Sequence, residues 1–395
     1  MKMKFLIAPF LWLFAMLASA NDGVYYVNGN QIVPLQETDI AVTKEVLTIT
    51  MGNDDFARVD VQYEFTNRGK AKTIDVGFEA QGPYEPGGDS EFNKAGKHPD
   101  IFDFTVEMNG AQLPIRNYVM RGSATDDSPD FTPLDLNQWK LDDEEGEGLR
   151  NKNTDEFINY SYAYCFKANF KEGKNVVHHT YRYRMSSGVY QTFNIPYWLM
   201  PAMRWANHQI DDFTLRLKVD KTAKQFCMTV DDTWMANQWK LTSGKGKIRT
   251  VNSPWGGDSK YVEFALRDGT YEFHANNFRP KENINILSTE CLTLSESETF
   301  KLGSFYDRGT VLIAPYELQF DDEDGKFFDG TTDGISNKRI IRNLPYAHRG
   351  YVFQDAKLKA YFSKIWWYMP DPNWKQDTSD FTEEEWKLIR EAKEE

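Results

Sequence analysis

The sequence predicts a mainly β protein, with an antiparallel, β-sandwich-like body of two sheets or subdomains followed by a small α-helical C-terminal domain. Three observations support this class. Segments such as residues 57–65 alternate apolar and polar side chains, which places one face of a strand in a core and the other in water. Turn signals such as Asn109-Gly110 separate these segments. Helix start and stop signals gather in about the last 60 residues.

The first 20 residues have the features of a secretory signal peptide. Lys2 and Lys4 precede an apolar run over residues 5–17, and residues 18–20 read Ala-Ser-Ala, a small-x-small cleavage pattern. The mature chain is expected to begin near Asn21, with no transmembrane segment after signal cleavage, because no later run reaches the ~20 apolar residues of a spanning helix. An uncleaved N-terminal membrane helix is the alternative. The predicted location is periplasmic or extracellular.

Composition narrows the classes of partner and chemistry. The 395 residues include 59 Asp and Glu against 46 Lys and Arg, so nucleic acid is not expected as a partner. Cys165, Cys227 and Cys291 permit one disulfide in an oxidising compartment and leave one thiol over. Their spacing matches no zinc site, and neither a metal site nor a cofactor is predicted.

The domain organisation follows from shifts in composition. A β-rich body is expected over residues 21–320, with 185–210 as the place where it would divide. An acidic linker over 321–334 then leads to a helical domain at 335–395.

Turn signals predict hairpins within the body. Residues 67–70 would return the chain from the strand at 57–65 into a strand at 73–78. Asn109-Gly110 readily takes the positive φ angles of a type I′ turn, and Asp268-Gly269 is a second hairpin signal. His178 and His179 are adjacent on a strand, so we expect their rings on opposite faces, unable to share a metal.

Two acidic stretches invite a calcium interpretation. Residues 142–147 form a carboxylate cluster, but like charges in a row favour a solvated loop. In the stretch 321–334, the best EF-hand register uses Gly334 as the central glycine, and Ile340 then occupies the position of the bidentate Glu. A flexible acidic linker is therefore the favoured interpretation.

An aromatic-rich connection could line a ligand groove, although core packing is favoured because aromatic side chains bury so much area. Its members are Tyr190, Phe193, Tyr197, Trp198 and Trp205.

The C-terminal segment predicts three short helices. The first begins after Ser336 and should stop at Pro345, with Gly350 able to take the left-handed conformation that turns the chain. The second starts at the N-cap Asp355 and ends before Pro370. In the third, Thr382 and Glu385 form a capping box, and Phe381 and Trp386 a hydrophobic staple.

Residues 346–353, Tyr-Ala-His-Arg-Gly-Tyr-Val-Phe, resemble the core of the YARHG domain, a small module of exported bacterial proteins. The usual Arg-His order is inverted to His348-Arg349, and Pro345 stands where a helix-compatible residue is usual. The resemblance runs from about Ile335 to the end of the chain. It implies a fold and an exported location but no chemistry, because the family's own function is unestablished. A second resemblance rests on residues 22–50, 59–67, 177–183, 205–213 and 278–286. Through these segments, residues 22 to about 290 resemble a family of exported bacterial proteins of unknown function, which implies a β-sandwich-like body.

Four residues of the C-terminal domain are candidate ligand contacts: His348, Arg349, Trp367 and Trp374. The aromatic residues are otherwise expected to fill a core, and a carboxylate partner within the fold is expected for Arg349. Catalytic residues are not predicted, since no G-x-S-x-G elbow, H-E-x-x-H helix, Walker loop or C-x-x-C pair occurs.

The sequence therefore favours an exported, non-enzymatic cell-envelope protein that binds a cell-wall polymer or an envelope protein. The alternatives are an exported hydrolase acting on envelope peptide or glycan, because paired carboxylates can meet in space, and a purely structural or assembly role.

Overall fold

The architecture is taken from a computed structural model of the full chain. It describes residues 29–30, 32–35, 38–52, 54–83, 93–122, 131–142, 148–188, 191–230, 233–253, 259–289 and 331–392. The predicted signal peptide, Cys291, residues 143–147 and most of the predicted acidic linker lie outside these ranges.

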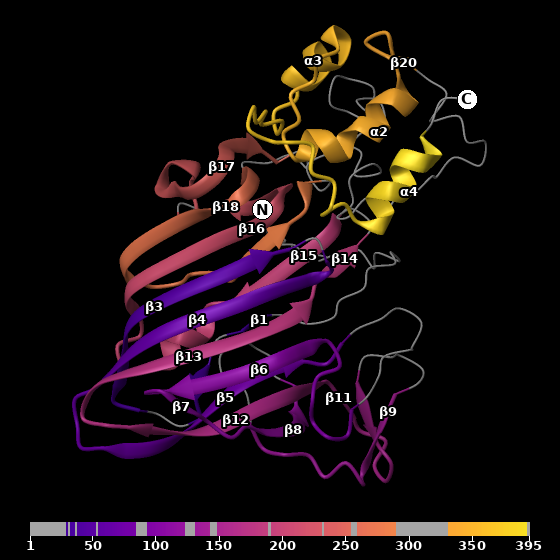
Figure 1. The fold of residues 1–395 in the computed structure, drawn as a ribbon. Helices are drawn as coiled ribbons and strands as arrows, with labels where there is room; N and C mark the ends of the chain where they lie inside the picture. The colour runs from indigo at the N-terminus through magenta and orange to yellow at the C-terminus, as the bar shows by residue number, and fades with distance from the viewer. Residues whose placement is uncertain are drawn as a thin grey trace, which may run out of the picture.

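A large sheet of twelve strands forms one layer of the body (Figure 1). Its main path runs β1-β15-β19-β16-β3-β4-β13-β6-β7, with β14 beside β15, and with β18 and β17 continuing from β16. The pairs are antiparallel except β1 with β15 and β3 with β16. The strands are β1 (Gly29–Asn30), β3 (Ile40–Met51), β4 (Phe56–Asn67), β6 (Ile101–Met108), β7 (Ala111–Gln112), β13 (Gly173–Arg184), β14 (Ser186–Gly188), β15 (Gln191–Trp198), β16 (Ile210–Val230), β17 (Trp239–Asn252), β18 (Lys260–Phe278) and β19 (Ile284–Leu287).

A second sheet of four strands covers part of the first. Its order is β2-β5-β12-β8, and a small sheet β11-β10-β9 lies nearby (Figure 1). Ring contacts join the layers, such as Phe65 to Phe170 at 5.5 Å and Phe78 to Tyr181 at 5.1 Å. The remaining body elements are β2 (Val33–Pro34), β5 (Lys72–Gln81), β8 (Arg116–Arg121), β9 (Trp139–Leu141), β10 (Leu149–Asn151), β11 (Phe157–Ile158), β12 (Tyr160–Phe170) and the 3₁₀ turns η1 (Met200–Arg204) and η2 (Ala236–Gln238). The predicted sandwich-like, mainly β body is confirmed.

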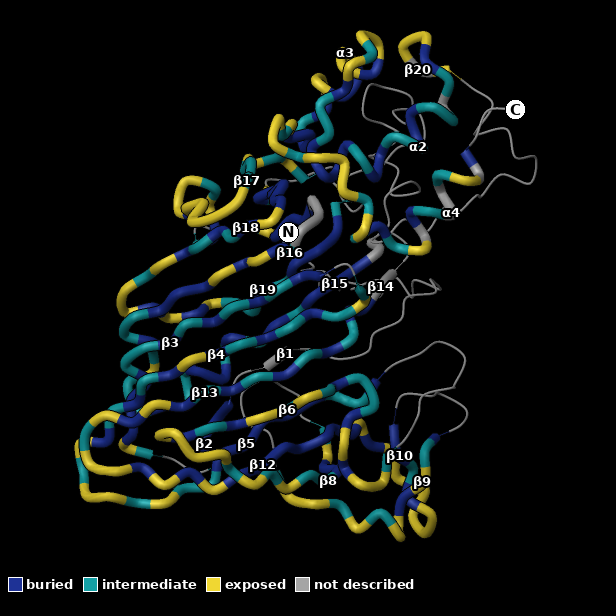
Figure 2. Tube along the Cα trace, in the orientation of Figure 1, coloured by how far each residue is buried: buried dark blue, intermediate teal, exposed yellow. Residues whose placement is uncertain are grey.

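Alternation along the strands explains the core. On β4 the buried positions recur at every second residue from Ala57 to Asn67, as the sequence pattern predicts (Figure 2). The same alternation places the adjacent histidines of β13 on opposite faces of the strand. His179 is fully buried with Nδ1 2.9 Å from the Thr105 carbonyl oxygen, whereas His178 is half exposed beside Asp60.

Two predicted hairpins differ from the structure. The chain does not return alongside β4 after residues 67–70; β4 pairs with β3 and β13, whereas β5 joins the second sheet. Local turn chemistry cannot distinguish a hairpin from a crossing between layers. Asp268-Gly269 also forms no turn, because β18 continues through it. Asn109-Gly110, with φ angles of 52° and 85°, does form the predicted tight turn between β6 and β7.

Cys165 and Cys227 are both buried. Three residues of the predicted aromatic belt are buried in the body core: Phe193, Tyr197 and Trp205.

The C-terminal module, residues 331–392, has its own hydrophobic cluster. A short hairpin, β20 (Thr331–Thr332) and β21 (Ile335–Ser336), precedes α2 (Asn337–His348), α3 (Ala356–Ser363) and α4 (Glu383–Glu391). Contrary to the sequence prediction, α2 does not stop at Pro345 but continues to His348. It ends only three residues after the proline, so few backbone bonds depend on that position.

The caps of the other two helices agree with the sequence. Asp355 accepts hydrogen bonds from the backbone amides of Lys357 and Leu358. At α4 the Thr382 hydroxyl accepts from the Glu385 amide, while the Glu385 carboxylate accepts from the Thr382 amide. The staple rings of Phe381 and Trp386 lie 5.2 Å apart.

The module lies at the end of the large sheet formed by β16, β18 and β17 (Figure 1). Ala265 of β18 belongs to the module's hydrophobic cluster rather than to the body core. Within the described ranges, no helix is both long and apolar enough to cross a membrane.

Candidate ligand-binding site between the body and the C-terminal module

A row of cations on β17 faces the module. Lys245, Lys247 and Arg249 are two residues apart, so their side chains lie on one face of the strand. Their cross-strand partners on β18 are Arg267, Ala265 and Glu263, in that order. The small Ala265 leaves room at the middle of this face for the module to approach.

The row donates to backbone carbonyls of the module. Lys247 Nζ donates to the carbonyl oxygens of Trp366 and Tyr368 at 2.7 and 3.1 Å. Burial at this contact lowers the pKa of Lys247. Arg249 pairs with Glu263 at 2.6 Å, and its guanidinium carbon lies 4.3 Å from the centre of the Trp366 ring. These contacts fix the segment before Pro370 against β17.

Lys245 and Arg267 lie directly opposite each other, an arrangement in which like charges repel. Asp371 of the module lies within 3.1 Å of Lys245 Nζ and 3.4 Å of Arg267 Nη2, and offsets this repulsion. The backbone amide of Asn373, followed by Lys245, lowers the pKa of Asp371. Burial lowers the pKa of Arg267, which is only 5% exposed.

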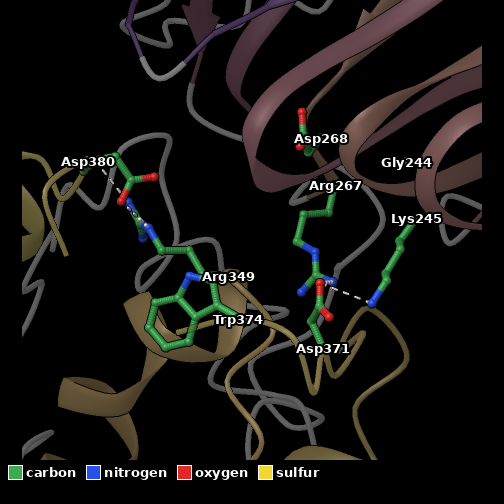
Figure 3. A pocket seen from close by; sticks show the side chains of 8 residues that line it. All are labelled: Gly244, Lys245, Arg267, Asp268, Arg349, Asp371, Trp374 and Asp380. Carbon is green, nitrogen blue, oxygen red and sulfur yellow. Dashed lines mark hydrogen bonds and ion pairs between the residues drawn. The ribbon is translucent and has the colours of Figure 1, made fainter. Parts of the chain in front are cut away.

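A pocket of about 360 Å³ opens between these residues and the module (Figure 3). Figure 3 shows Arg267, Lys245 and Asp371 on one side, with Arg349, Trp374 and Asp380 facing them. The lining residues are Gly244, Lys245, Arg267, Asp268, Arg349, Asp371, Trp374 and Asp380.

The pairing of β17 with β18 is irregular where Gly244 faces Asp268, and this irregularity shapes the body side of the pocket. The pairing register shifts on both sides of Ser243. Gly244 has a φ of 73°, and a Cβ there would overlap the Asp268 carbonyl oxygen, so only glycine fits. Asp268 itself has a φ of 41° and is exposed at the pocket. Bulges of this kind redirect side chains and are frequent beside functional sites.

The end of α2 supplies the facing side. The Tyr351 amide donates to the Tyr346 carbonyl and the Gly350 amide to the Ala347 carbonyl, both at 2.9 Å. With Gly350 at a φ of 83°, this is a Schellman motif, and the predicted left-handed glycine is present. The motif places Arg349 at the helix end and brings Gly350 against the guanidinium of Arg267.

Arg349 is 3% exposed and bound to carboxylates of its own module. Its Nη1 and Nη2 donate to the two oxygens of Glu385 at 2.7 and 2.9 Å, and its Nε donates to Asp380 at 3.0 Å. The same Glu385 forms the capping box of α4. Arg349 therefore links the end of α2 to the start of α4.

Trp374 is held in place by a turn and by two rings. The Asn373 amide donates to the Asp371 side chain and the Trp374 amide to the Asp371 carbonyl. The indole meets Tyr346 and Tyr351 edge-on at 6.3 and 5.9 Å. It remains partly exposed, which leaves an aromatic surface at the pocket.

The structure brings two of the four predicted contact residues, Arg349 and Trp374, to the pocket. The other two lie elsewhere in the module: His348 stacks on Trp367 with ring centres 4.3 Å apart, and both are buried. Among the described residues, no group of three or more His, Cys, Asp or Glu side chains could hold a metal ion.

A family model, described as the YARHG domain, matches the C-terminal module. Its match covers residues 334–395. This C-terminal module is a YARHG domain. Both side chains of the inverted pair His348-Arg349 have partners inside the domain, His348 on Trp367 and Arg349 on Glu385. YARHG domains occur in exported bacterial proteins.

One solved structure aligns with nearly the whole chain, beyond the body alone. A crystal structure from Legionella pneumophila, provisionally described as a nutrient binding protein, is 20% identical, covers 94% of this chain and all of its own, and has a TM-score of 0.50. The similarity shows a shared fold. Curated proteins yield no match.

Two further structures are similar at lower scores. An M1 zinc metallopeptidase from Deinococcus radiodurans is 9% identical with a TM-score of 0.23. The match covers 65% of this chain but only 43% of the peptidase. Baculovirus P35 is 11% identical with a TM-score of 0.22, covering 65% of this chain and 98% of P35.

The sequence reasoning missed the body side of the site. Lys245, Arg267 and Asp268 of the body were not candidates, and neither was Asp371 of the module. The alternation Lys-Gly-Lys-Ile-Arg over residues 245–249 is a readable signal of a cationic strand face. Asp268-Gly269 instead suggested a turn, which hid the bulge that places Asp268 at the pocket.

Proposed function

We propose that this protein is an exported, non-enzymatic cell-envelope protein that binds a cell-wall polymer or an envelope protein through the pocket between its body and its YARHG domain. The observation that carries the proposal is Trp374, a partly exposed indole that packs on Tyr346 and Tyr351 and lines the pocket together with three cations. An aromatic surface next to fixed polar groups is typical of binding sites.

Within this proposal the four candidate residues have different roles. Trp374 contacts the ligand, and Arg349 forms the wall beneath it. His348 and Trp367 have a supporting role: His348 stacks on Trp367, and Lys247 binds the backbone carbonyls on both sides of Trp367. Together these contacts hold the segment that leads to Trp374.

Export is supported by the N-terminal pattern of residues 1–20 and by the occurrence of YARHG domains in exported bacterial proteins. A binding role is supported by the similarity of the fold to the Legionella protein, to which nutrient binding has been ascribed.

The first experiment is co-sedimentation of the full mature chain with purified bacterial sacculi. We expect the unmodified protein to pellet and Trp374→Ala to lose most of its binding, because stacking surface is removed. Phe157→Ala is the matched control, since Phe157 is a partly exposed aromatic of β11, at the other end of the body. Equal pelleting of the two variants would contradict the role of the pocket. Release of soluble glycan or peptide from the sacculi would favour a hydrolase instead.

A further inference from the structure

The charges of the pocket are of both signs and lie apart. On the body side, Lys245 and Arg267 share a single carboxylate, that of Asp371 from the YARHG domain. Asp268 is exposed at the same edge and has no ion-pair partner within the described part of the chain. On the YARHG side, Arg349 is already neutralised by Glu385 and Asp380. A purely anionic ligand would meet three aspartates, and a purely cationic ligand would meet Lys245 and Arg267.

Arg267 has donor capacity that the described residues do not use. Its side chain is 6% exposed and points into the pocket (Figure 3). Nη2 makes only the long 3.4 Å contact to Asp371, and Nη1 has no hydrogen-bond partner among the described residues. A buried guanidinium with an unused donor gains free energy from any acceptor that reaches it, and a carboxylate is the acceptor that fits it best.

The size of the pocket limits the ligand. At about 360 Å³ it lies at the small end of the range for small-molecule sites, roughly 300–1,000 Å³. Trp374 forms its aromatic wall, which suits an apolar group between the two charged ends.

We propose that this pocket binds a small zwitterion with both a carboxylate and an ammonium group, as in an α-amino acid or a short peptide with free ends. The carboxylate lies at Arg267 and Lys245, the ammonium group at Asp268, and the apolar part against Trp374. This inference rests on the proposed binding function and names the chemical class of its ligand.

The test is isothermal titration calorimetry of the full mature chain with L-leucine, L-phenylalanine and alanyl-alanine. Binding of the amino acids assigns the source to free amino acids, and binding of the dipeptide alone assigns it to peptide ends. For the ligand that binds, removing either charge, as in the amide or the N-acetyl derivative, should weaken binding by about tenfold or more. Absence of binding by all three probes, or equal binding of the blocked derivatives, overturns the proposal.

A matched pair of variants tests the position of the ligand. Asp268→Asn should weaken binding of the zwitterion by about fivefold or more, because a charge-assisted contact is lost. Asp103→Asn is the control: Asp103 is also a strand aspartate with positive φ, at 55°, but lies on β6. Asparagine tolerates this backbone, so both variants should fold. Equal affinity of the two variants overturns the assignment of Asp268.

The experiments distinguish failure of the zwitterion proposal from failure of the proposed envelope binding. If the protein pellets with sacculi through Trp374 but binds no zwitterion, the ligand class is wrong and envelope binding stands. If the protein binds a zwitterion but does not pellet with sacculi, the ligand class stands and polymer binding is wrong.

Discussion

Arg349, a residue of the YARHG motif, directs its guanidinium donors to partners within its own domain. The guanidinium meets Glu385 with two donors and Asp380 with a third, and its carbon lies 4.0 Å from the centre of the Phe381 ring. Both partners of the central pair are almost completely buried, at 2% and 1% side-chain exposure. The cost of removing both charges from water offsets much of their attraction, so a buried pair of this kind is weak evidence for net stability.

Breaking that pair should be costly. We expect Arg349→Met to lower the free energy of unfolding of the YARHG domain by about 3–5 kcal/mol, because it leaves the Glu385 carboxylate buried without a counter-charge. Urea denaturation followed by tryptophan fluorescence measures the change. Arg390→Met is the matched control, since the Arg390–Glu383 pair is exposed at 55% and 79%, and surface pairs contribute little. Similar losses in both variants would show that burial of the pair is unimportant.

At the scale of the element, the end of α2 joins two parts of the chain. Gly350 completes the Schellman motif, and its carbonyl accepts from the Asp371 amide at 2.7 Å. A Cβ at this position would overlap both the Arg267 guanidinium and the Met369 carbonyl oxygen. The helix end therefore fits the body only with glycine.

Gly350→Ala should separate backbone strain from this close contact. Gly110→Ala is the matched control, because Gly110 has nearly the same φ, 85°, but nothing within 4 Å of a Cβ. Both variants incur the left-handed strain of roughly 1–2 kcal/mol. Gly350→Ala should lose clearly more, and should also make the 331–336 segment more sensitive to limited proteolysis. Equal losses in thermal unfolding would mean that Arg267 moves away at little cost.

Elements were predictable wherever the signal is local. The caps at Asp355 and Thr382, the staple at Phe381 and the turn at Asn109 depend on neighbouring residues and are all present. Pairings that depend on distant strands were not predictable. Asp268-Gly269 has the composition of a hairpin turn, as Asn109-Gly110 does, but the chain forms a bulge there. The reason is that β16 and β17 pair with β18 on both sides, so β18 continues through this position.

At the scale of the whole molecule, the site is assembled from segments more than 100 residues apart. Lys245 and Arg267 meet Asp371 only because the YARHG domain rests on the β17–β18 face. The sequence could identify Arg349 and Trp374 within a recognisable module. It could not show which face of the body the module covers, since that depends on the packing of Ala265.

The stability of the body should depend on pH through His179. Burial lowers the pKa of this ring to about 4. The unfolded chain binds a proton near pH 6.5 and the folded chain does not, so stability is full above about pH 6.5 and falls until about pH 4. The loss is on the order of 3 kcal/mol.

Substituting His179 should flatten this part of the pH profile. Thermal unfolding of His179→Gln between pH 7 and 4.5 should vary less than that of the unmodified protein. His178→Gln, on the exposed face of the same strand, is the control. An unchanged slope in His179→Gln would show that other groups set the acid sensitivity.

The contact between β17 and the YARHG domain has a consequence for sequence divergence. Lys247 binds the carbonyl oxygens of residues 366 and 368, and Lys245 reaches that of residue 370. Every amino acid carries a carbonyl oxygen, so substitutions at these three positions cannot delete the acceptors. Lys245 and Lys247 can therefore keep their contacts with this segment of the YARHG domain when its side chains are substituted. Relatives can differ widely in sequence along the segment while the two domains stay in contact.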